Sequence, residues 1–313
     1  ALARQTQPPN EIIVVDDGST DATARVATEF GARCITIAHG GPAAARNAGA
    51  RAAHGQLVLF TDADCEPALD WVAQLVHPFT NPYIVGVKGA YRTRQRAGLP
   101  RLVQAEFEDK YARMRARTWI DFVDTYSAAY RREVLLTAGG FQEVFPVASV
   151  EDVELSFRLA AQGAKLVFRP QAIVWHRHPT TLGLYLRRKA RYGFWRALLY
   201  TWHPQKIRGD AHTDPVLKWQ LALAGLASAA GGAALLQAGW WPLPVLVCLL
   251  LLATTSGFVR RTWRRDRLAA VLAPPVHVVR AFAQGWALAV GLLVHLLFPG
   301  FVARQTRVAT RLE

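Results

Sequence analysis

Cysteine is scarce in this sequence. Its 313 residues include three cysteines, Cys34, Cys65 and Cys248, which are widely separated along the chain. This spacing provides neither the paired cysteines of a disulfide framework nor the clustered ligands of a structural zinc site. The soluble part of the chain is therefore expected in a reducing compartment.

Acidic residues are also outnumbered. The chain has 37 lysines and arginines against 23 aspartates and glutamates, so its formal net charge is +14. This excess favours an anionic partner, such as a phosphate, a lipid headgroup or a nucleic acid. Residues 181–208 mix cations with leucine and aromatic side chains, and long apolar segments follow. The pattern is typical of a basic amphipathic segment at a membrane surface, and it argues against nucleic acid as the partner.

Three long segments contain almost no charge: residues 219–239, 240–259 and 281–303. Each is long enough to cross about 30 Å of hydrocarbon as a helix. The first two are nearly contiguous and predict a tight hairpin. The stretch 260–267 is expected to be a cationic loop that stays in the cytoplasm, which places the first part of the chain there too. A third span would carry the basic tail 304–313 outward, so a re-entrant or interfacial third segment remains an alternative.

Strands and helices alternate over the first part of the chain. Short β-branched runs are followed by helical stretches that end at glycine. This alternation predicts an α/β fold with a mostly parallel sheet flanked by helices. In such sheets ligands bind at the carboxyl ends of the strands. The expected strands are residues 12–15, 32–38, 56–64 and 83–91, with extended chain at 165–179, and the expected helices are residues 18–31, 41–55, 66–79, 101–118 and 150–163, with a further strand and helix within 124–141.

One expected strand ends on the sequence "FTDAD". Asp62 and Asp64 follow the apolar run "QLVLF", which places two carboxylates at a strand end. Carboxylates in this position can share a divalent cation with a diphosphate, and oxygen ligands favour Mg²⁺ or Mn²⁺. An isolated D-x-D triplet is common by chance, but a second acidic strand end strengthens the interpretation.

That second strand end carries Asp16 and Asp17. A carboxylate there can accept a hydrogen bond from a nucleobase N–H group or from ribose hydroxyls. The alternative is capping of the following helix. Ser19 and Asp21 already provide candidate caps, which favours ligand binding as the role of Asp16 and Asp17.

Two helices carry further candidate residues. Arg46 and Asn47 lie on a helix that otherwise consists largely of alanine and glycine, so Arg46 can approach a base carbonyl or a phosphate, unless it is simply solvated. Glu151 and Asp152 lie in the first turn of another helix, after the stretch "FPVAS". Asp152 is the candidate general base there, and the alternative for this acidic pair is complementation of the helix dipole.

Taken together, these motifs resemble glycosyltransferase family 2. The segments "VVDDGSTD", "AARNAG", "FTDAD", "AYRR" followed by "GGF", and "VEDVELSFRL" occur in the order and spacing of that family. The resemblance covers residues 1 to about 200. It implies the GT-A nucleotide-sugar fold, a Rossmann-like sheet, and an inverting transfer from a nucleotide-activated sugar, with a UDP-sugar as the first expectation and GDP second.

The resemblance also implies roles for individual residues. Asp152 would deprotonate the acceptor hydroxyl. His176 in "VWHRHP" is similar to a histidine that helps bind metal or diphosphate, and an ordinary strand-end histidine is its alternative. The implied nucleotide-sugar-binding residues are Asp16, Asp17, Arg46, Asn47, Asp62 and Glu151, and the implied ligands for Mg²⁺ or Mn²⁺ are Asp64, Asp62 and His176.

Some features depart from the family pattern. The strand with a "P-x-x-N" turn that opens family members is not seen, so the natural start is expected to be missing. The polymerase motif Q-x-x-R-W is replaced by "RRKARYGFWR", which predicts non-processive transfer. The expected organisation is a GT-A domain at 1–180, a basic interface segment at 181–212, a membrane region at 213–303 and a tail at 304–313.

The sequence therefore predicts a metal-dependent glycosyltransferase at the cytoplasmic membrane face, acting on a lipid, lipid-linked or polysaccharide acceptor. The alternative is a non-catalytic nucleotide-sugar-binding subunit of an envelope polysaccharide assembly complex. A nucleotidyltransferase would need a glycine-rich, lysine-bearing phosphate loop at the first strand, and none is visible.

Overall fold

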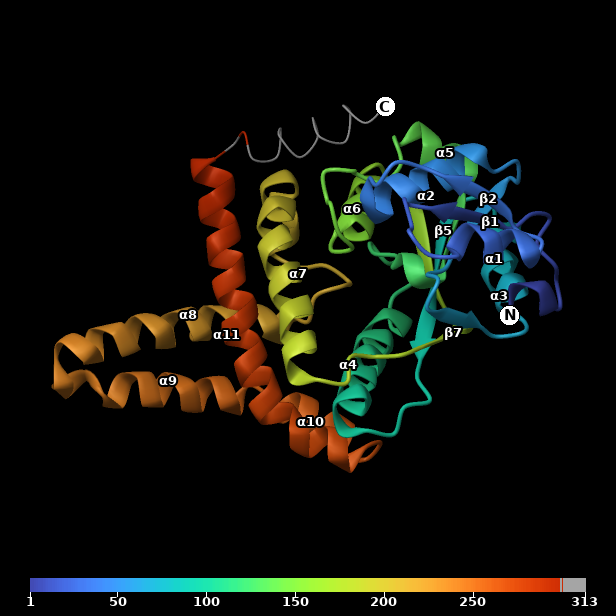
Figure 1. Ribbon diagram of the computed structural model, residues 1–313. Helices are drawn as coiled ribbons and strands as arrows, with labels where there is room; N and C mark the ends of the chain where they lie inside the picture. The colour runs from blue at the N-terminus through green and yellow to red at the C-terminus, as the bar shows by residue number, and fades with distance from the viewer. Residues whose placement is uncertain (299, 301–313) are drawn as a thin grey trace. The chain divides into compact units, whose positions relative to one another are not determined.

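The computed structural model describes residues 1–298 and 300 (Figure 1). The chain forms two compact units. The first contains residues 1–92 and 114–176, and the second contains residues 93–113 and 177–297. The predicted tail 304–313 lies outside the described residues.

The seven strands found among the described residues all lie in the first unit, and most of its helices follow the predicted order. Its strands are β1 (Ile13–Asp16), β2 (Arg33–Thr36), β3 (Leu57–Phe60), β4 (Cys65–Pro67), β5 (Ile84–Arg92), β6 (Ala128–Arg131) and β7 (Lys165–His176). Its helices are α1 (Thr23–Glu29), α2 (Gly41–Ala52), α3 (Trp71–Val76), α5 (Arg132–Thr137) and α6 (Glu151–Ala161), with short 3-10 turns η1 (Leu2–Arg4), η2 (His77–Thr80) and η3 (Thr125–Ser127).

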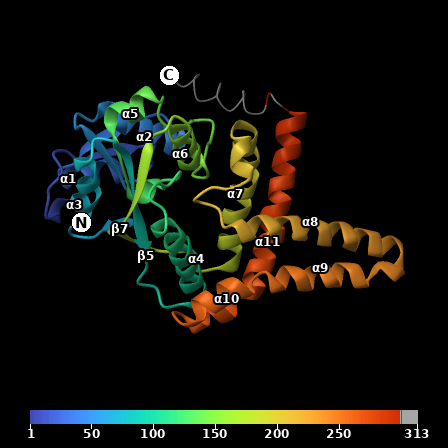
Figure 2. The same cartoon turned by 180° about the vertical axis from the view of Figure 1, so that it is seen from behind.

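The strands of this unit form two sheets. β1 and β2 pair in parallel, and the other five strands are ordered β3–β6–β5–β7–β4. Figures 1 and 2 show β5 and β7 running side by side as a parallel pair. The predicted α/β class is confirmed, but the pairing is mixed, because β6 lies antiparallel between β3 and β5 and β4 is antiparallel to β7. The chain between β5 and β6 contains α4 and η3, and a connection of this length can return in either direction. It therefore allows β6 to pair antiparallel with β5.

Strand β5 passes through the core of this unit. Val87 is fully buried, and Gly89 lies so close to its neighbours that a Cβ atom there would be 2.0 Å from Ser127 Oγ and 2.2 Å from the Ala172 carbonyl oxygen. Ser127 Oγ accepts a hydrogen bond from Trp71 Nε1 at 2.8 Å and donates one to that carbonyl at 3.1 Å. Glycine at position 89 therefore lets β5 approach the segment before β6.

We expect Gly89→Ala to destabilise the protein by about 1–3 kcal/mol, because the added methyl group has to displace backbone as well as a side chain. Denaturant unfolding of the detergent-solubilised chain measures the loss. Gly183→Ala is the control, since a Cβ atom at Gly183 would have no heavy atom within 4 Å. Equal stability of the two variants would contradict the close approach.

The second unit is helical. Its helices are α4 (Gly98–Arg115, largely in this unit), α7 (Leu182–Trp202), α8 (Pro215–Leu236), α9 (Pro242–Ala253), α10 (Ser256–Trp263) and α11 (Arg267–Leu297), with 3-10 turns η4 (Pro204–Ile207) and η5 (Ala238–Trp240). α7 lies beside α11, and α8 forms a hairpin with α9 (Figures 1 and 2). The predicted hairpin is thereby confirmed.

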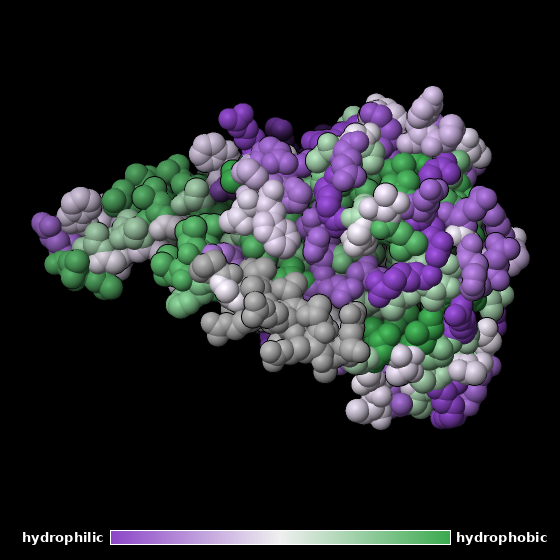
Figure 3. All heavy atoms as spheres, turned by 90° about the horizontal axis from the view of Figure 1, so that it is seen from above, coloured by the Kyte–Doolittle hydropathy of each residue, from purple (hydrophilic) through white to green (hydrophobic). Residues whose placement is uncertain are grey.

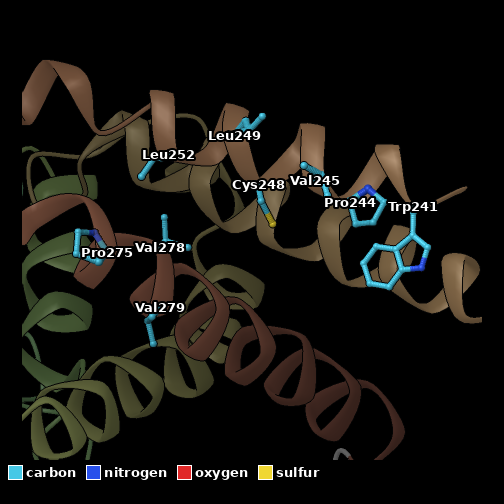
Figure 4. A pocket seen from close by; sticks show the side chains of 9 residues that line it. All are labelled: Trp241, Pro244, Val245, Cys248, Leu249, Leu252, Pro275, Val278 and Val279. Carbon is cyan, nitrogen blue, oxygen red and sulfur yellow. The ribbon is translucent and has the colours of Figure 1, made fainter.

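Three helical segments of this unit are long and apolar enough to cross a membrane: Pro215–Leu236, Pro242–Trp263 and Arg267–Leu297. Apolar side chains cover much of the α8–α9 hairpin surface, which is green in Figure 3. Between α9 and α11 an apolar groove of about 550 Å³ is open at the surface (Figure 4). Contact of such an apolar surface with hydrocarbon is favourable, whereas its exposure to water costs free energy.

Two details of this region differ from the sequence analysis. The stretch 260–267 was expected to be a loop, but α10 continues to Trp263, and the Arg261 guanidinium binds the carboxylate of Asp109. The third apolar helix begins at Arg267 rather than at residue 281, because its first turns pack alanines against α10. Residues 299 and 301–303 of the third predicted segment lie outside the described residues.

Candidate functional site

The acidic triplet after β3 forms a compact cluster. The ligand atoms of Asp62, Asp64 and Cys65 all lie within 4.8 Å of one another. His176 Nε2 lies 3.5 Å from Asp64 Oδ2, because Cys65 of β4 pairs with His176 at the end of β7. The structure thus brings the three predicted metal ligands together and adds a thiol that the sequence analysis did not assign.

The donors of this cluster fit a hard divalent cation. Burial, together with the charges of Asp62 and Asp64, raises the pKa of the Cys65 thiol to about 12. The thiol is a soft donor that a hard cation does not favour, so two carboxylates and an imidazole are the matching donors. Carboxylate oxygens suit Mg²⁺ or Mn²⁺, and an imidazole is compatible with Mn²⁺.

Arg46 connects this cluster to the start of α6. Its Nη2 lies 3.2 Å from Asp62 Oδ1, and its Nη1 lies 2.7 Å from Glu151 Oε1. Burial lowers the pKa of Arg46, but the charges of Glu151, Asp62 and Asp152 outweigh burial and raise it. The guanidinium is therefore a fixed cation shared by two acidic segments. The nucleobase contact expected for Arg46 stays a prediction.

Asp152 lies next to this pair in the first turn of α6. The residue is partly exposed, and its Oδ2 accepts a hydrogen bond from the Thr125 amide at 3.4 Å. Burial raises the pKa of Asp152 well above its ordinary value, the charges of Glu151 and Asp124 raise it further, and Arg46 acts in the opposite direction. A carboxylate with a raised pKa is a stronger base once it is ionised.

The two aspartates at the end of β1 are held by nearby loops. Asp16 is buried, and its Oδ1 accepts a hydrogen bond from the Ser19 amide at 2.8 Å. Asp17 accepts from the amides of Gly40 at 2.7 Å and Gly41 at 2.9 Å. These contacts fasten the end of β1 to its following turn and to the start of α2. The nucleotide-binding role of both residues stays a prediction.

Asn47 is used inside the protein. Its Nδ2 donates to the Phe141 carbonyl at 2.9 Å and to Glu143 at 2.7 Å, and its Oδ1 accepts from the Phe141 amide at 2.8 Å. Gly140 has a φ of +66°, and a Cβ atom there would lie 2.4 Å from Asn47 Oδ1. Asn47 thus secures the double-glycine turn after α5, and its predicted contact with a nucleotide sugar stays a prediction.

Sequence reasoning missed a buried cation beside this site. Lys88 in the middle of β5 is fully buried and forms an ion pair with Asp124. The signal was available, because a lysine interrupts the otherwise apolar and small residues of 83–91. A buried lysine needs an anionic partner, but the sequence alone does not identify it.

Comparison with known proteins gives two family matches. The model of "Glycosyl transferase family 2" matches residues 1–137, and that of "Glycosyl transferase family group 2" matches residues 82–299. Together they cover both units described above.

Individual relatives and a solved structure agree with these matches. A pre-mycofactocin glycosyltransferase of Mycobacterium tuberculosis is 34% identical over 218 residues, which are 62% of this chain and 43% of the relative. An O-antigen chain rhamnosyltransferase of Salmonella typhimurium is 28% identical over 198 residues, which are 58% of this chain and 61% of the relative. The chain thus spans about half the length of these relatives.

A mannosyltransferase from Pyrobaculum calidifontis, solved with GDP-Man and Mn²⁺, has a similar fold. The TM-score is 0.56 at 21% sequence identity, and the match covers 93% of this chain and 80% of that chain. At this identity the likeness shows the fold alone.

Proposed function

Because the chain belongs to glycosyltransferase family 2, we propose that it transfers a sugar from a nucleotide-sugar donor to a lipid or lipid-linked acceptor with inversion at the anomeric carbon. The observation that carries the proposal is the connected set of charges in the first unit. Asp62 and Glu151 share Arg46, and Asp152 lies beside them. Arg46 thus holds one carboxylate of the acidic cluster together with the residue that precedes the candidate base.

In this proposal the acidic cluster receives the donor. Asp62, Asp64 and His176 would hold Mg²⁺ or Mn²⁺, and the ion would neutralise the charge that develops on the departing diphosphate. Arg46 keeps Asp62 and Glu151 at fixed positions and limits their mutual repulsion. UDP is the first expectation for the nucleotide and GDP the second.

Asp152 serves as the general base. Its carboxylate takes the proton from an acceptor hydroxyl, and the hydroxyl oxygen forms a bond to the anomeric carbon. The bond from that carbon to the diphosphate oxygen breaks, and the electron pair leaves with the nucleoside diphosphate. Attack on the face opposite the leaving group inverts the configuration. As a residue, Asp152 is partly exposed, which is consistent with the approach of an acceptor to this end of α6.

The second unit supports a membrane-bound acceptor. Its three apolar helical segments anchor the chain, and the cationic residues around 260–267 favour a cytoplasmic position for that end of the hairpin. A catalytic unit on the same side would use cytoplasmic nucleotide sugars and act on an acceptor in the adjacent leaflet. The motif "RRKARYGFWR" in place of Q-x-x-R-W points to the addition of one sugar at a time.

Membranes containing the protein, incubated with a panel of radiolabelled UDP- and GDP-sugars and Mn²⁺, test this function. Transfer of label into the lipid extract is the expected result. Nucleotide-sugar binding without transfer to any extract acceptor would favour the non-catalytic subunit instead. Absence of both binding and transfer would refute the proposal.

We expect Asp64→Ala to weaken Mn²⁺ binding by at least about tenfold, because it removes one of few charged ligands from the cluster. Titration of the purified protein with Mn²⁺, followed by electron paramagnetic resonance, measures the affinity without any sugar donor. Glu29→Gln is the control, since Glu29 is an exposed carboxylate that pairs with Arg25 on α1. Equal affinities for Asp64→Ala and the control would place the metal elsewhere.

A further inference from the structure

Lys88 is a buried cation in the first unit that the proposed chemistry does not use. Its side chain is fully buried in β5. The ammonium group forms an ion pair with Asp124 and donates hydrogen bonds to Tyr126 Oη at 2.7 Å and to the Gly89 carbonyl at 3.2 Å. It also lies 4.5 Å from the centroid of the Tyr126 ring. Removing this amine would take an ion-pair contact from Asp124 and a hydrogen-bond contact from Tyr126.

The partners of Lys88 bracket a short segment that reaches the candidate base. Residues 124–127 contain η3 and lead into β6. Asp124 and Tyr126 bind Lys88, while the amide of Thr125, between them, donates to Asp152. Ser127 is held separately by Trp71 Nε1. The ammonium group of Lys88 thus holds two residues of this segment, and the amide of the residue between them donates to Asp152.

The same ammonium group also supports the metal-ligand side of the site. The ring of Tyr126 stacks on that of Tyr91, and the Tyr91 ring meets His176 edge to face, with centroids 4.7 Å apart. His176 in turn faces Asp64. One continuous set of contacts therefore leads from Lys88 to a candidate metal ligand, and another leads to the candidate base.

We propose that Lys88 is a positioning residue of the transfer site, whose buried ion pair with Asp124 sets the place and the electrostatic environment of Asp152. The proposal rests on the function proposed above. Lys88 does not touch substrate in this scheme; it acts through Asp124 and the segment 124–127.

The charges around Asp152 make this role measurable. Glu151 on the same helix and Asp124 from the neighbouring segment oppose its ionisation, and Arg46 from α2 favours it. Tyr130 of β6 also faces this carboxylate, and burial raises the pKa of that phenol so that it is uncharged near neutral pH. Lys88 compensates the charge of Asp124, so its loss makes ionisation of Asp152 harder. Loss of Asp124 has the opposite effect.

Infrared titration of the full chain in detergent tests the proposal without requiring transfer activity. The carboxyl band of protonated Asp152 is identified by its disappearance in Asp152→Asn. We expect Lys88→Met to raise the titration midpoint of that band by about one pH unit, and Asp124→Asn to lower it by a similar amount. The double variant Lys88→Met/Asp124→Asn removes both charges and should return the midpoint to near the wild-type value.

The opposite directions separate positioning from a purely structural role. If the pair only stabilised the fold, both single variants would lose folded protein and leave the midpoint unchanged, or move it in the same direction, and either result overturns the proposal. If Lys88→Met does not accumulate, Asp124→Asn and the double variant decide, and equal midpoints in these two overturn it. The rate parameter kcat/KM should fall at low pH as Asp152 becomes protonated. The pH at which it falls should shift between variants in the same order as the infrared midpoints. Inactive wild-type protein with the expected midpoints would refute the proposed function but not the role of Lys88.

Discussion

Replacing Asp152 with asparagine is expected to lower the rate of sugar transfer by a factor of about 10²–10⁴, the usual contribution of a positioned general base. Asparagine has nearly the same size and can still accept the hydrogen bond from the Thr125 amide. It cannot accept a proton from the acceptor hydroxyl. Initial rates of labelled-sugar transfer, with the donor identified from the panel, measure the loss. Binding of the donor should change little, because Asp152 acts on the acceptor.

The pH dependence of this variant provides a second, independent check. The pKa of Asp152 is raised, so the wild-type rate should increase as the pH rises through that pKa and the carboxylate ionises. The remaining rate of Asp152→Asn should lack this rise with pH, because the variant has no carboxylate to ionise at that position. Glu29→Gln serves as the control and should retain both the rate and its rise with pH. A variant that keeps more than about a tenth of the wild-type rate would assign the base elsewhere.

Much of the first unit follows from local sequence signals. Alternating apolar runs and glycine-terminated helical stretches located β1, α2 and β3, because strand and helix periodicities are encoded locally. Strand order is not local. The position of β6 between β3 and β5 depends on pairings between residues far apart in the chain, so a sheet with mixed directions was not apparent from the alternation of elements.

The candidate site likewise has features that local sequence predicts and features that only the tertiary structure determines. The adjacency of Asp62 and Asp64 was readable, since two residues at one strand end remain close in any fold. The bridge formed by Arg46 needs α2 and α6 to approach each other, and the contact between His176 and Asp64 depends on the register of β4 against β7. Residue type suggested these side chains as candidates, but only the tertiary structure determines their partners. The roles in substrate binding stay predictions.

For the second unit, length and hydropathy identified the apolar helices, but the polar contacts that join its helices were not predictable. Glu106 of α4 is the clearest example. Its Oε1 accepts hydrogen bonds from Tyr185 Oη at 2.7 Å and Arg280 Nη1 at 2.8 Å, and its Oε2 accepts from Lys189 Nζ at 2.9 Å. His277 Nε2 lies 3.2 Å from the same carboxylate. One acidic side chain thus joins α4 to α7 and α11.

Replacing Glu106 with alanine is expected to lower the free energy of unfolding by about 3–5 kcal/mol, because the remaining cations become buried without their anion. Burial alone would raise the pKa of Glu106. The charge of Lys189, together with His277 and Arg280 of α11, outweighs burial and lowers the pKa well below its ordinary value. The carboxylate is therefore charged whenever the unit is folded near neutral pH. Denaturant titration of the full chain in detergent, monitored by tryptophan fluorescence, measures the difference.

The neighbouring acid on the same helix provides a matched control for Glu106. Glu108 accepts a hydrogen bond from Gln104 within α4, so Glu108→Ala should cost much less than Glu106→Ala. A group with a lowered pKa in the folded state stabilises above its unfolded pKa and loses that effect as the pH falls through the folded value. The difference between the wild type and Glu106→Ala should therefore persist at neutral pH and shrink as the solution is acidified below the ordinary glutamate pKa. Equal unfolding free energies for the two alanine variants, or a difference that grows on acidification, would show that the Glu106 carboxylate does not hold these helices together.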